Sequence, residues 1–189
     1  MPNLLRTAML LGACACAMPA ATAAWLPPRA QAELTLEAQF IVELAGVVRF
    51  PRAKEPGQPF VLAVIGASPF RDEIESYAAG RTVRGRPIRI RNLRYPPEGQ
   101  NCDLLFICRS EWPRARSILD WSRSKGMLTV AEGQDLAPLG VMVNLMVDGG
   151  YLRLGLNQRA LEGEGLSIDS RVLRVARILV PGHPLAESP

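Results

Sequence analysis

The sequence predicts an α/β fold: a three-layer sandwich with a mostly parallel central sheet, a C-terminal β-hairpin and a closing helix. Two continuous apolar runs, residues 60–65 and 104–108, have the length of strands that are covered on both faces, as in parallel sheets. Segments with helical spacing of apolar residues alternate with these strands. Near the C-terminus, Asp148-Gly149-Gly150 separates two strand-like segments, 141–147 and 151–156, which predicts a hairpin.

The first half of this pattern is expected to begin with an extended lead-in over residues 25–33. Thr35 is the expected N-cap of a helix that Pro51 ends, because apolar residues recur at helical spacing between them. The first buried strand is followed by a predicted helix over 69–79. In the next segment, 87–93, apolar and polar residues alternate, which predicts an edge or half-exposed strand.

The second half is expected to place a helix after the second buried strand, capped by Ser110, with Pro113 in its first turn, and ended by Gly126. A short strand over 127–131 then precedes the hairpin. The closing helix is predicted from apolar residues that would line one of its faces: Ile168, Val172, Val175 and Leu179.

The N-terminal segment has the layout of a secretory signal peptide. A single cation, Arg6, precedes an apolar stretch over 8–18, which is followed by Pro19 and the small-residue cleavage site Ala21-Thr22-Ala23. The stretch is shorter than the about 20 residues that span a bilayer. We expect residues 1–23 to be removed on export. An alternative remains open, because Leu11-Gly12-Ala13-Cys14 resembles a lipobox and would make the protein a lipoprotein anchored at Cys14.

Residues 24–189 are expected to form a single domain with a core over about 36–179 and a flexible tail over 181–189. The chain has 22 Lys and Arg against 18 Asp and Glu, a net charge of +4, which falls to +3 when Arg6 is removed. Export and the scattered placement of the basic residues argue against nucleic acid as a partner. A mildly basic face suits an acidic protein surface or anionic head groups. No further apolar run approaches membrane-spanning length.

Two of the four cysteines, Cys102 and Cys108, lie beyond the signal peptide. They flank a predicted strand, which would separate their Cα atoms by roughly 20 Å. A disulfide requires a separation below about 7 Å. We therefore expect no bridge within the chain, and either free thiols or pairing between molecules. Cys108, at the end of the strand, is the one expected to be more accessible.

The sequence offers no set of residues typical of catalysis. Its one histidine, His183, lies in the expected tail, which leaves no triad and no zinc ligand set. We expect no catalytic residue, no metal and no cofactor. The turn at Gly66 and Ser68 follows a buried strand and opens a helix, where α/β folds hold ligands. With Ser110 at the end of the second buried strand, it is either an ordinary turn or a small-molecule site.

Three arginines recur every three residues in the expected closing helix: Arg171, Arg174 and Arg177. They would lie opposite the apolar stripe. Two interpretations stay open, a solvated face or a docking surface for an acidic partner.

Several fragments, taken in order, resemble the YfiR family of small exported bacterial proteins. The resemblance covers roughly residues 36–179. It rests on the segments Val47-Val48-Arg49-Phe50-Pro51, 60–66 with Ser68-Pro69-Phe70, 83–90, 102–107, 128–130, 141–145, 152–157, Ala160 and 165–176. It implies a periplasmic α/β domain that often forms a homodimer. The best-understood relative represses an inner-membrane diguanylate cyclase, and so limits cyclic di-GMP, exopolysaccharide production and biofilm formation. The resemblance thus implies a regulator with a membrane-anchored partner rather than an enzyme.

The chain departs from the family pattern at Ala63. Many relatives carry a cysteine at this place and bridge it to the cysteine that matches Cys102. Ala63 cannot form that bridge, so the resemblance does not carry redox control over to this chain.

Overall fold

The computed structural model describes residues 28–51, 57–133, 136–148, 151–168 and 177–178. The predicted signal peptide, the cleavage site and the C-terminal tail lie outside these residues. Within them, no helix is both long enough and apolar enough to cross a membrane.

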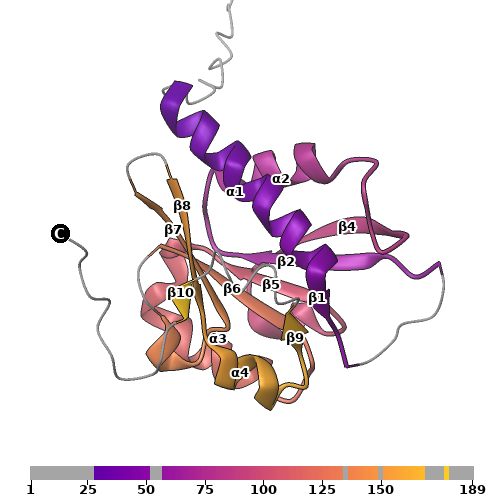
Figure 1. Ribbon diagram of the computed structural model, residues 1–189, viewed down its shortest axis with the longest axis vertical. Coiled ribbons are helices and arrows are strands. Elements are labelled where there is room, and N and C mark those ends of the chain that lie inside the picture. Colours follow the sequence, from indigo (N-terminus) through magenta and orange to yellow (C-terminus); the bar gives the residue numbers. More distant parts are fainter. Residues whose placement is uncertain (1–27, 52–56, 134–135, 149–150, 169–176, 179–189) are drawn as a thin grey trace, which may run out of the picture.

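The main feature of the fold is an eight-stranded sheet with the order β10-β8-β7-β6-β5-β2-β4-β3 (Figure 1). Its five central strands run parallel to one another: β2 (Phe60–Ile65), β4 (Arg86–Leu93), β5 (Leu104–Ile107), β6 (Leu128–Glu132) and β7 (Val143–Asp148). The hairpin strand β8 (Tyr151–Leu156) is antiparallel to β7. The sheet is thus mostly parallel, as predicted.

The sheet ends in two very short strands. β3 (Thr82–Val83) pairs antiparallel with β4, and β10 (Arg177–Ile178) pairs parallel with β8. A separate two-stranded antiparallel sheet joins β1 (Val48–Arg49) to β9 (Ser167–Ile168).

Helices cover both faces of the sheet (Figure 1). The α-helices are α1 (Pro28–Val47), α2 (Phe70–Ala78), α3 (Ala115–Ser122) and α4 (Gln158–Gly163), and the 3₁₀ helices are η1 (Pro96–Gly99), η2 (Arg109–Arg114) and η3 (Ala137–Leu139). α1 and α2 pack together on one face, and α3 packs on the other. This arrangement confirms the three-layer sandwich.

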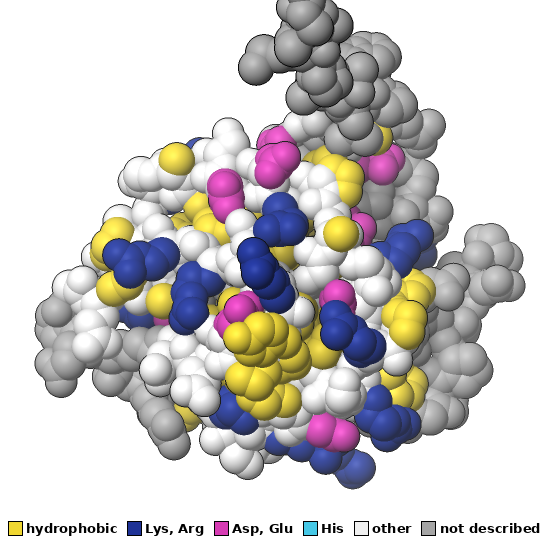
Figure 2. All heavy atoms as spheres, turned by 180° about the vertical axis from the view of Figure 1, so that it is seen from behind, with side chains coloured by type: hydrophobic (Ala, Val, Ile, Leu, Met, Phe, Trp, Pro, Cys, Tyr) yellow, Lys and Arg dark blue, Asp and Glu magenta, His cyan; other side chains and the backbone are white. Residues whose placement is uncertain are grey.

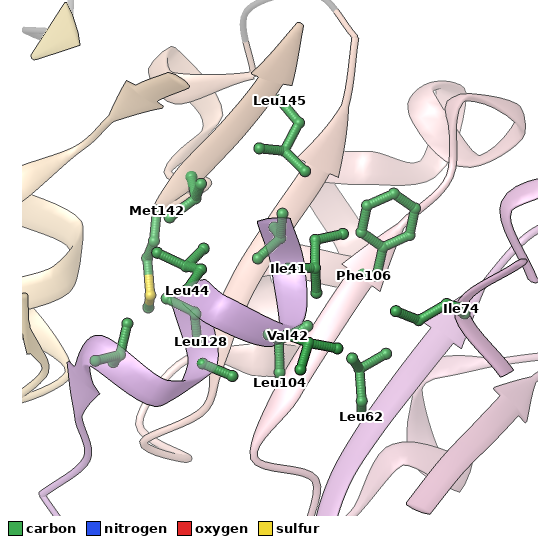
Figure 3. Packing of buried hydrophobic residues seen from close by; sticks show 14 of the residues in the cluster. Ile41, Val42, Leu44, Leu62, Ile74, Leu104, Phe106, Leu128, Met142 and Leu145 are labelled. Carbon is green, nitrogen blue, oxygen red and sulfur yellow. The ribbon is translucent and has the colours of Figure 1, made fainter. Parts of the chain in front are cut away.

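The alternation of side chains along a strand divides the core into two clusters. Leu62 and Val64 of β2 belong to the cluster under α1 and α2, whereas Ala63 and Ile65 belong to the cluster under α3. Figure 3 shows α1 crossing the sheet, with Ile41, Val42 and Leu44 facing side chains of several strands. Because both faces are covered, a continuous apolar run is what this strand needs.

The first helix begins earlier than predicted. It includes residues 28–33, which are therefore not extended, and Thr35 lies inside it rather than at its N-cap. The Thr35 hydroxyl donates to the Gln31 carbonyl oxygen (3.0 Å) and lies 2.8 Å from Glu73 Oε1. The hydroxyl group that suggested an N-cap thus contacts Glu73 of α2 instead.

Ser110 does not cap the helix predicted after β5. The chain first forms η2, which contains Pro113, and α3 follows at Ala115 and ends at Ser122, before Gly126. The Ser110 hydroxyl instead accepts a hydrogen bond from the Ala67 backbone N–H at 2.8 Å, in the loop that follows β2.

The prediction of a closing helix is wrong at its two ends, which are the parts of it that the structure describes. Ile168 lies in β9, paired with Val48, and Arg177 lies in β10, paired with Gly155. Residues 169–176 and Leu179 lie outside the described residues. A strand on β8 satisfies backbone groups that would otherwise form a sheet edge, and β-branched residues such as Ile suit a ladder. The helical spacing of apolar residues did not reveal these partners.

At the amino ends of the parallel strands, the part-buried Arg86 and the buried Asp103 form an ion pair. Arg86 Nη2 lies 2.9 Å from Asp103 Oδ2, and Nη1 lies 3.1 Å from Oδ1. The same guanidinium donates to the Gln58 and Pro59 carbonyl oxygens, while Asp103 Oδ2 accepts from the Val61 N–H at 2.8 Å. This pair therefore joins the starts of β2, β4 and β5.

Candidate functional site

A cavity of about 250 Å³ lies at the carboxyl ends of β2, β5 and β6, against the N-terminal half of α1. We call it the acidic pocket. Its polar lining includes side chains from α1, from the loop after β2, from η2 and from the end of β6: Glu33, Glu37, Ser68, Arg109 and Glu132. Apolar lining comes from Leu34, Pro69 and Leu145. Carboxyl ends of parallel strands are where open α/β sheets bind ligands.

Glu37 is the unusual group of this pocket. Only 7% of the residue is exposed, and its Oε2 atom has no hydrogen-bond partner among the described residues. Burial, and after it the negative charges of Glu132 and Glu33, raises the pKa of Glu37 to about 7, although Arg109 acts in the opposite direction. The carboxyl is therefore close to half-protonated at neutral pH.

Glu132 and Arg109 are held together at the wall of the pocket. Glu132 Oε2 accepts a hydrogen bond from the Arg109 backbone N–H at 3.3 Å, and the Glu132 carbonyl oxygen accepts from Trp112 Nε1 at 3.1 Å. The Arg109 guanidinium lies 5.4 Å from the centre of the Trp112 ring.

Gly133 makes this arrangement possible. Its φ is +87°, and a Cβ atom there would lie 2.6 Å from Trp112 Cζ2 and 3.0 Å from Arg109 Nη2. A side chain at this position would therefore displace the indole or the guanidinium from the pocket wall.

Two of the predicted ligand residues meet, but they do not line the acidic pocket. Gly66 has a φ of +104°, and a Cβ atom on it would lie 2.6 Å from Ser110 Oγ and from Glu111 Cγ. Gly66 and Ser110 thus pack against each other and join the loops after β2 and β5. Ser68 alone of the three lines the pocket, and its hydroxyl accepts from the Phe70 N–H at 3.2 Å.

Cys102 and Cys108 are both thiols and both buried. The expectation that Cys108 is the more accessible is wrong, because Cys108 has no exposed surface while Cys102 is 5% exposed. Burial, followed by the charge of Glu132, raises the pKa of the Cys108 thiol to about 12. Ala63 belongs to the same buried cluster as Cys102, on the α3 face of the sheet.

The three arginines predicted as a docking strip are not described as a helical row. Arg177 lies in β10, and Arg171 and Arg174 lie outside the described residues. Figure 2 shows the face opposite to that of Figure 1, on which Lys and Arg side chains are spread around a patch of hydrophobic side chains. Basic charge on this face is distributed rather than gathered into one stripe.

A second, larger cavity of about 460 Å³ lies between α3, η3 and α4, with Arg123 and Arg159 in its lining. Two buried polar side chains that line it have partners: Thr129 Oγ1 accepts from the Met142 N–H at 3.1 Å, and Asn157 Nδ2 donates to the Ala137 carbonyl oxygen at 3.0 Å. This differs from the acidic pocket, where the Glu37 carboxyl is left with an unused oxygen.

The sequence did not predict that Glu37, Arg109 and Glu132 come together. One signal was present, because Glu37 lies among the apolar residues of α1, next to Ala38 and one turn before Ile41. A charged residue on the buried face of a helix is unusual and indicates a special environment. Within the described residues, no group of three or more His, Cys, Asp or Glu is arranged to hold a metal ion.

A family model described as YfiR/HmsC-like matches residues 34–177. The chain matches no curated protein significantly. Two solved structures share its fold. One is a conserved domain protein from Vibrio cholerae O1 biovar El Tor, with a TM-score of 0.54 and 12% identity over 77% of this chain. The other is an ABC domain in complex with L-Trp from Streptococcus pneumoniae, with a TM-score of 0.53 and 12% identity over 76% of this chain. The chain spans 59% and 60% of their respective lengths.

Proposed function

Because this chain belongs to the YfiR/HmsC-like family, we propose that it represses an inner-membrane signalling protein, most directly a diguanylate cyclase, by binding the periplasmic part of that protein. Family membership supports a periplasmic regulatory role in general. The cyclase, the resulting control of cyclic di-GMP and of biofilm or exopolysaccharide output, and a homodimeric state are the finer parts of the proposal.

The family match over residues 34–177 is the observation that carries this function. The export pattern of residues 1–23 supports it, since a repressor of this kind has to meet its partner outside the cytoplasm. Scattered basic charge also supports a protein partner with an acidic surface more than it supports nucleic acid.

Deletion of the gene tests the proposal through the level of cyclic di-GMP. We expect the level to rise, together with biofilm formation, because the repressor is lost. The wild-type gene supplied in trans should restore both. A copy without residues 1–23 should not restore them, because it stays in the cytoplasm. An unchanged cyclic di-GMP level in the deletion strain would contradict the proposal.

A second candidate function is a periplasmic small-molecule carrier or sensor. The acidic pocket favours it, because a cavity with convergent polar groups lies at the carboxyl edge of the parallel sheet, beside Ser68. The two functions are compatible, since a bound ligand could act as the signal that releases a partner.

A further inference from the structure

The acidic pocket combines negative charge with an unsatisfied buried group. Glu33, Glu37 and Glu132 contribute three carboxyls to its lining, and Arg109 contributes a single cation. Glu37 lines this space, and its buried Oε2 atom has no hydrogen-bond partner among the described residues. A buried carboxylate without a partner is costly, because it loses its hydration and gains nothing in return. A donor that carries positive charge would supply what is missing.

We propose that the acidic pocket binds a small organic cation, a protonated primary amine whose ammonium group donates to Glu37 and whose short apolar chain lies along Leu34 and Leu145. This names the ligand class for the sensor function proposed above and rests on it. It does not depend on which membrane protein the chain regulates.

The shape and lining of the pocket favour an amine over an inorganic ion. Its volume of about 250 Å³ lies just below the about 300–1,000 Å³ of drug-sized sites, which suits a molecule with few heavy atoms. Apolar side chains form part of the wall and would contact methylene groups, whereas a hydrated metal ion prefers oxygen ligands around it. The described residues also contain no acidic group arranged as a metal site.

Proton binding competes with this ligand. Glu37 is faced by Glu33 of the same helix, by Glu132 of β6 and by Arg109 of η2. Because its pKa is about 7, the ionised form that an ammonium group requires becomes more abundant as pH rises. Its fraction increases from about one tenth at pH 6 to about nine tenths at pH 8. An alkylammonium ion with a pKa like that of lysine, about 10.4, stays charged throughout.

The test uses n-butylammonium chloride as the probe and isothermal titration calorimetry with the protein purified from the periplasmic fraction. We expect saturable binding at pH 8 that weakens about tenfold at pH 6. Glu37→Gln should weaken binding at pH 8 by at least about tenfold, because the charge that faces the ammonium is removed. The matched control is Glu43→Gln, which removes the same charge from an exposed position on α1 and should bind like the wild type.

Three outcomes would overturn the proposal. One is the absence of butylammonium binding at pH 8 to a protein whose circular dichroism is native. Another is equal affinity in wild type and Glu37→Gln. The third is displacement of butylammonium by equimolar sodium or calcium chloride, which would make the pocket a site for inorganic cations. None of these bears on the rise in cyclic di-GMP, so failure of the ligand proposal and failure of the repressor proposal can be told apart.

Discussion

Two buried carboxyl groups lie at opposite ends of the parallel strands, which we call the amino edge and the carboxyl edge of the sheet. Their surroundings differ. At the amino edge, Asp103 is 4% exposed and meets Arg86 through two contacts and the Val61 N–H through a third. At the carboxyl edge, Glu37 is 7% exposed and has an oxygen without a partner among the described residues. Because the two residues are almost equally buried, the two sites differ in the hydrogen bonds and in the nearby charges that each carboxyl group meets. The carboxyl group at the amino ends of the strands is satisfied by partners, whereas the one at the carboxyl ends stays titratable near neutral pH in the lining of a cavity.

The largest expected effect comes from breaking the satisfied carboxyl. Asp103→Asn leaves Arg86, whose side chain is 18% exposed, without its counter-charge. Removing one partner of a fully buried pair costs about 3–5 kcal/mol. Because Arg86 is only part-buried, we expect a loss of unfolding free energy at the lower end of this range, about 3 kcal/mol, by urea denaturation. Asp120→Asn is the control, because its pair with Arg123 is exposed and should contribute at most about 1 kcal/mol. Equal losses in the two variants would mean that the Arg86–Asp103 pair contributes no more to stability than an exposed ion pair.

The unsatisfied carboxyl should behave in the opposite way. The Glu37 pKa rises from 4.5 to about 7 on folding, so between these values the folded state keeps a proton that the unfolded chain has released. Stability therefore falls as pH rises through this window, by about 3 kcal/mol in total. Glu37→Gln cannot ionise, and in ligand-free buffer it should be more stable than wild type by up to about 3 kcal/mol at pH 8.

Urea denaturation at several pH values checks this expectation. At pH 4.5 the variant and the wild type should have nearly equal stability, since both carry an uncharged side chain in the folded state. Glu43→Gln should follow the wild-type profile. If Glu37→Gln is less stable than the wild type at pH 8, the carboxylate has partners that outweigh its burial, and the contrast between the two edges disappears.

A smaller effect on stability is expected at Gly66, in the tightly packed part of the carboxyl edge beside the acidic pocket. Gly66→Ala introduces a Cβ atom 2.6 Å from Ser110 Oγ, whereas Gly80→Ala meets no atom within 4 Å. Both glycines have positive φ, +104° and +71°, so both variants carry backbone strain. Overpacking costs about 1–3 kcal/mol, and Gly66→Ala should therefore lose about 2 kcal/mol more than Gly80→Ala in thermal unfolding. Equal losses of stability in the two variants would mean that the loop at Ser110 moves to accommodate the added methyl group.

The smallest expected effect on stability comes from the arginines that the sequence predicts as a docking strip. If Arg171 and Arg174 are solvated, as the sequence predicts, reversing both to glutamate should leave the melting temperature nearly unchanged, because exposed ion pairs contribute about 0–1 kcal/mol each. Binding to the membrane partner should weaken, most strongly at low salt, if these residues meet an acidic surface. Surface plasmon resonance with the partner's periplasmic part would measure this. Equal affinities would assign the arginines to a solvated face.

Local pattern was sufficient for the central strands and the hairpin of the sheet, and insufficient for its short end strands and for contacts between distant segments. The run at 60–65 predicted β2 because its apolar residues serve both faces, and Asp148-Gly149-Gly150 predicted the hairpin. The N-cap predicted at Thr35 is wrong, because the sequence alone does not distinguish a capping hydroxyl from one that contacts Glu73 of another helix. The closing helix was wrong at Arg177 for the same reason, since β10 depends on β8. The acidic pocket joins α1, η2 and β6, and no spacing along the chain relates Glu37 to Glu132.

The short strand β3 has a consequence for how the protein behaves at high concentration. It covers only Arg86 and Pro87 of β4, so most of the eight residues of β4 lie beyond its reach. Sheet edges of this kind invite strand addition by another copy, which leads to aggregation. Along β4, the exposed residues include Arg89 and Arg91, and two copies laid edge to edge would bring like charges together. The repulsion between these arginines should therefore oppose the pairing of two copies through β4.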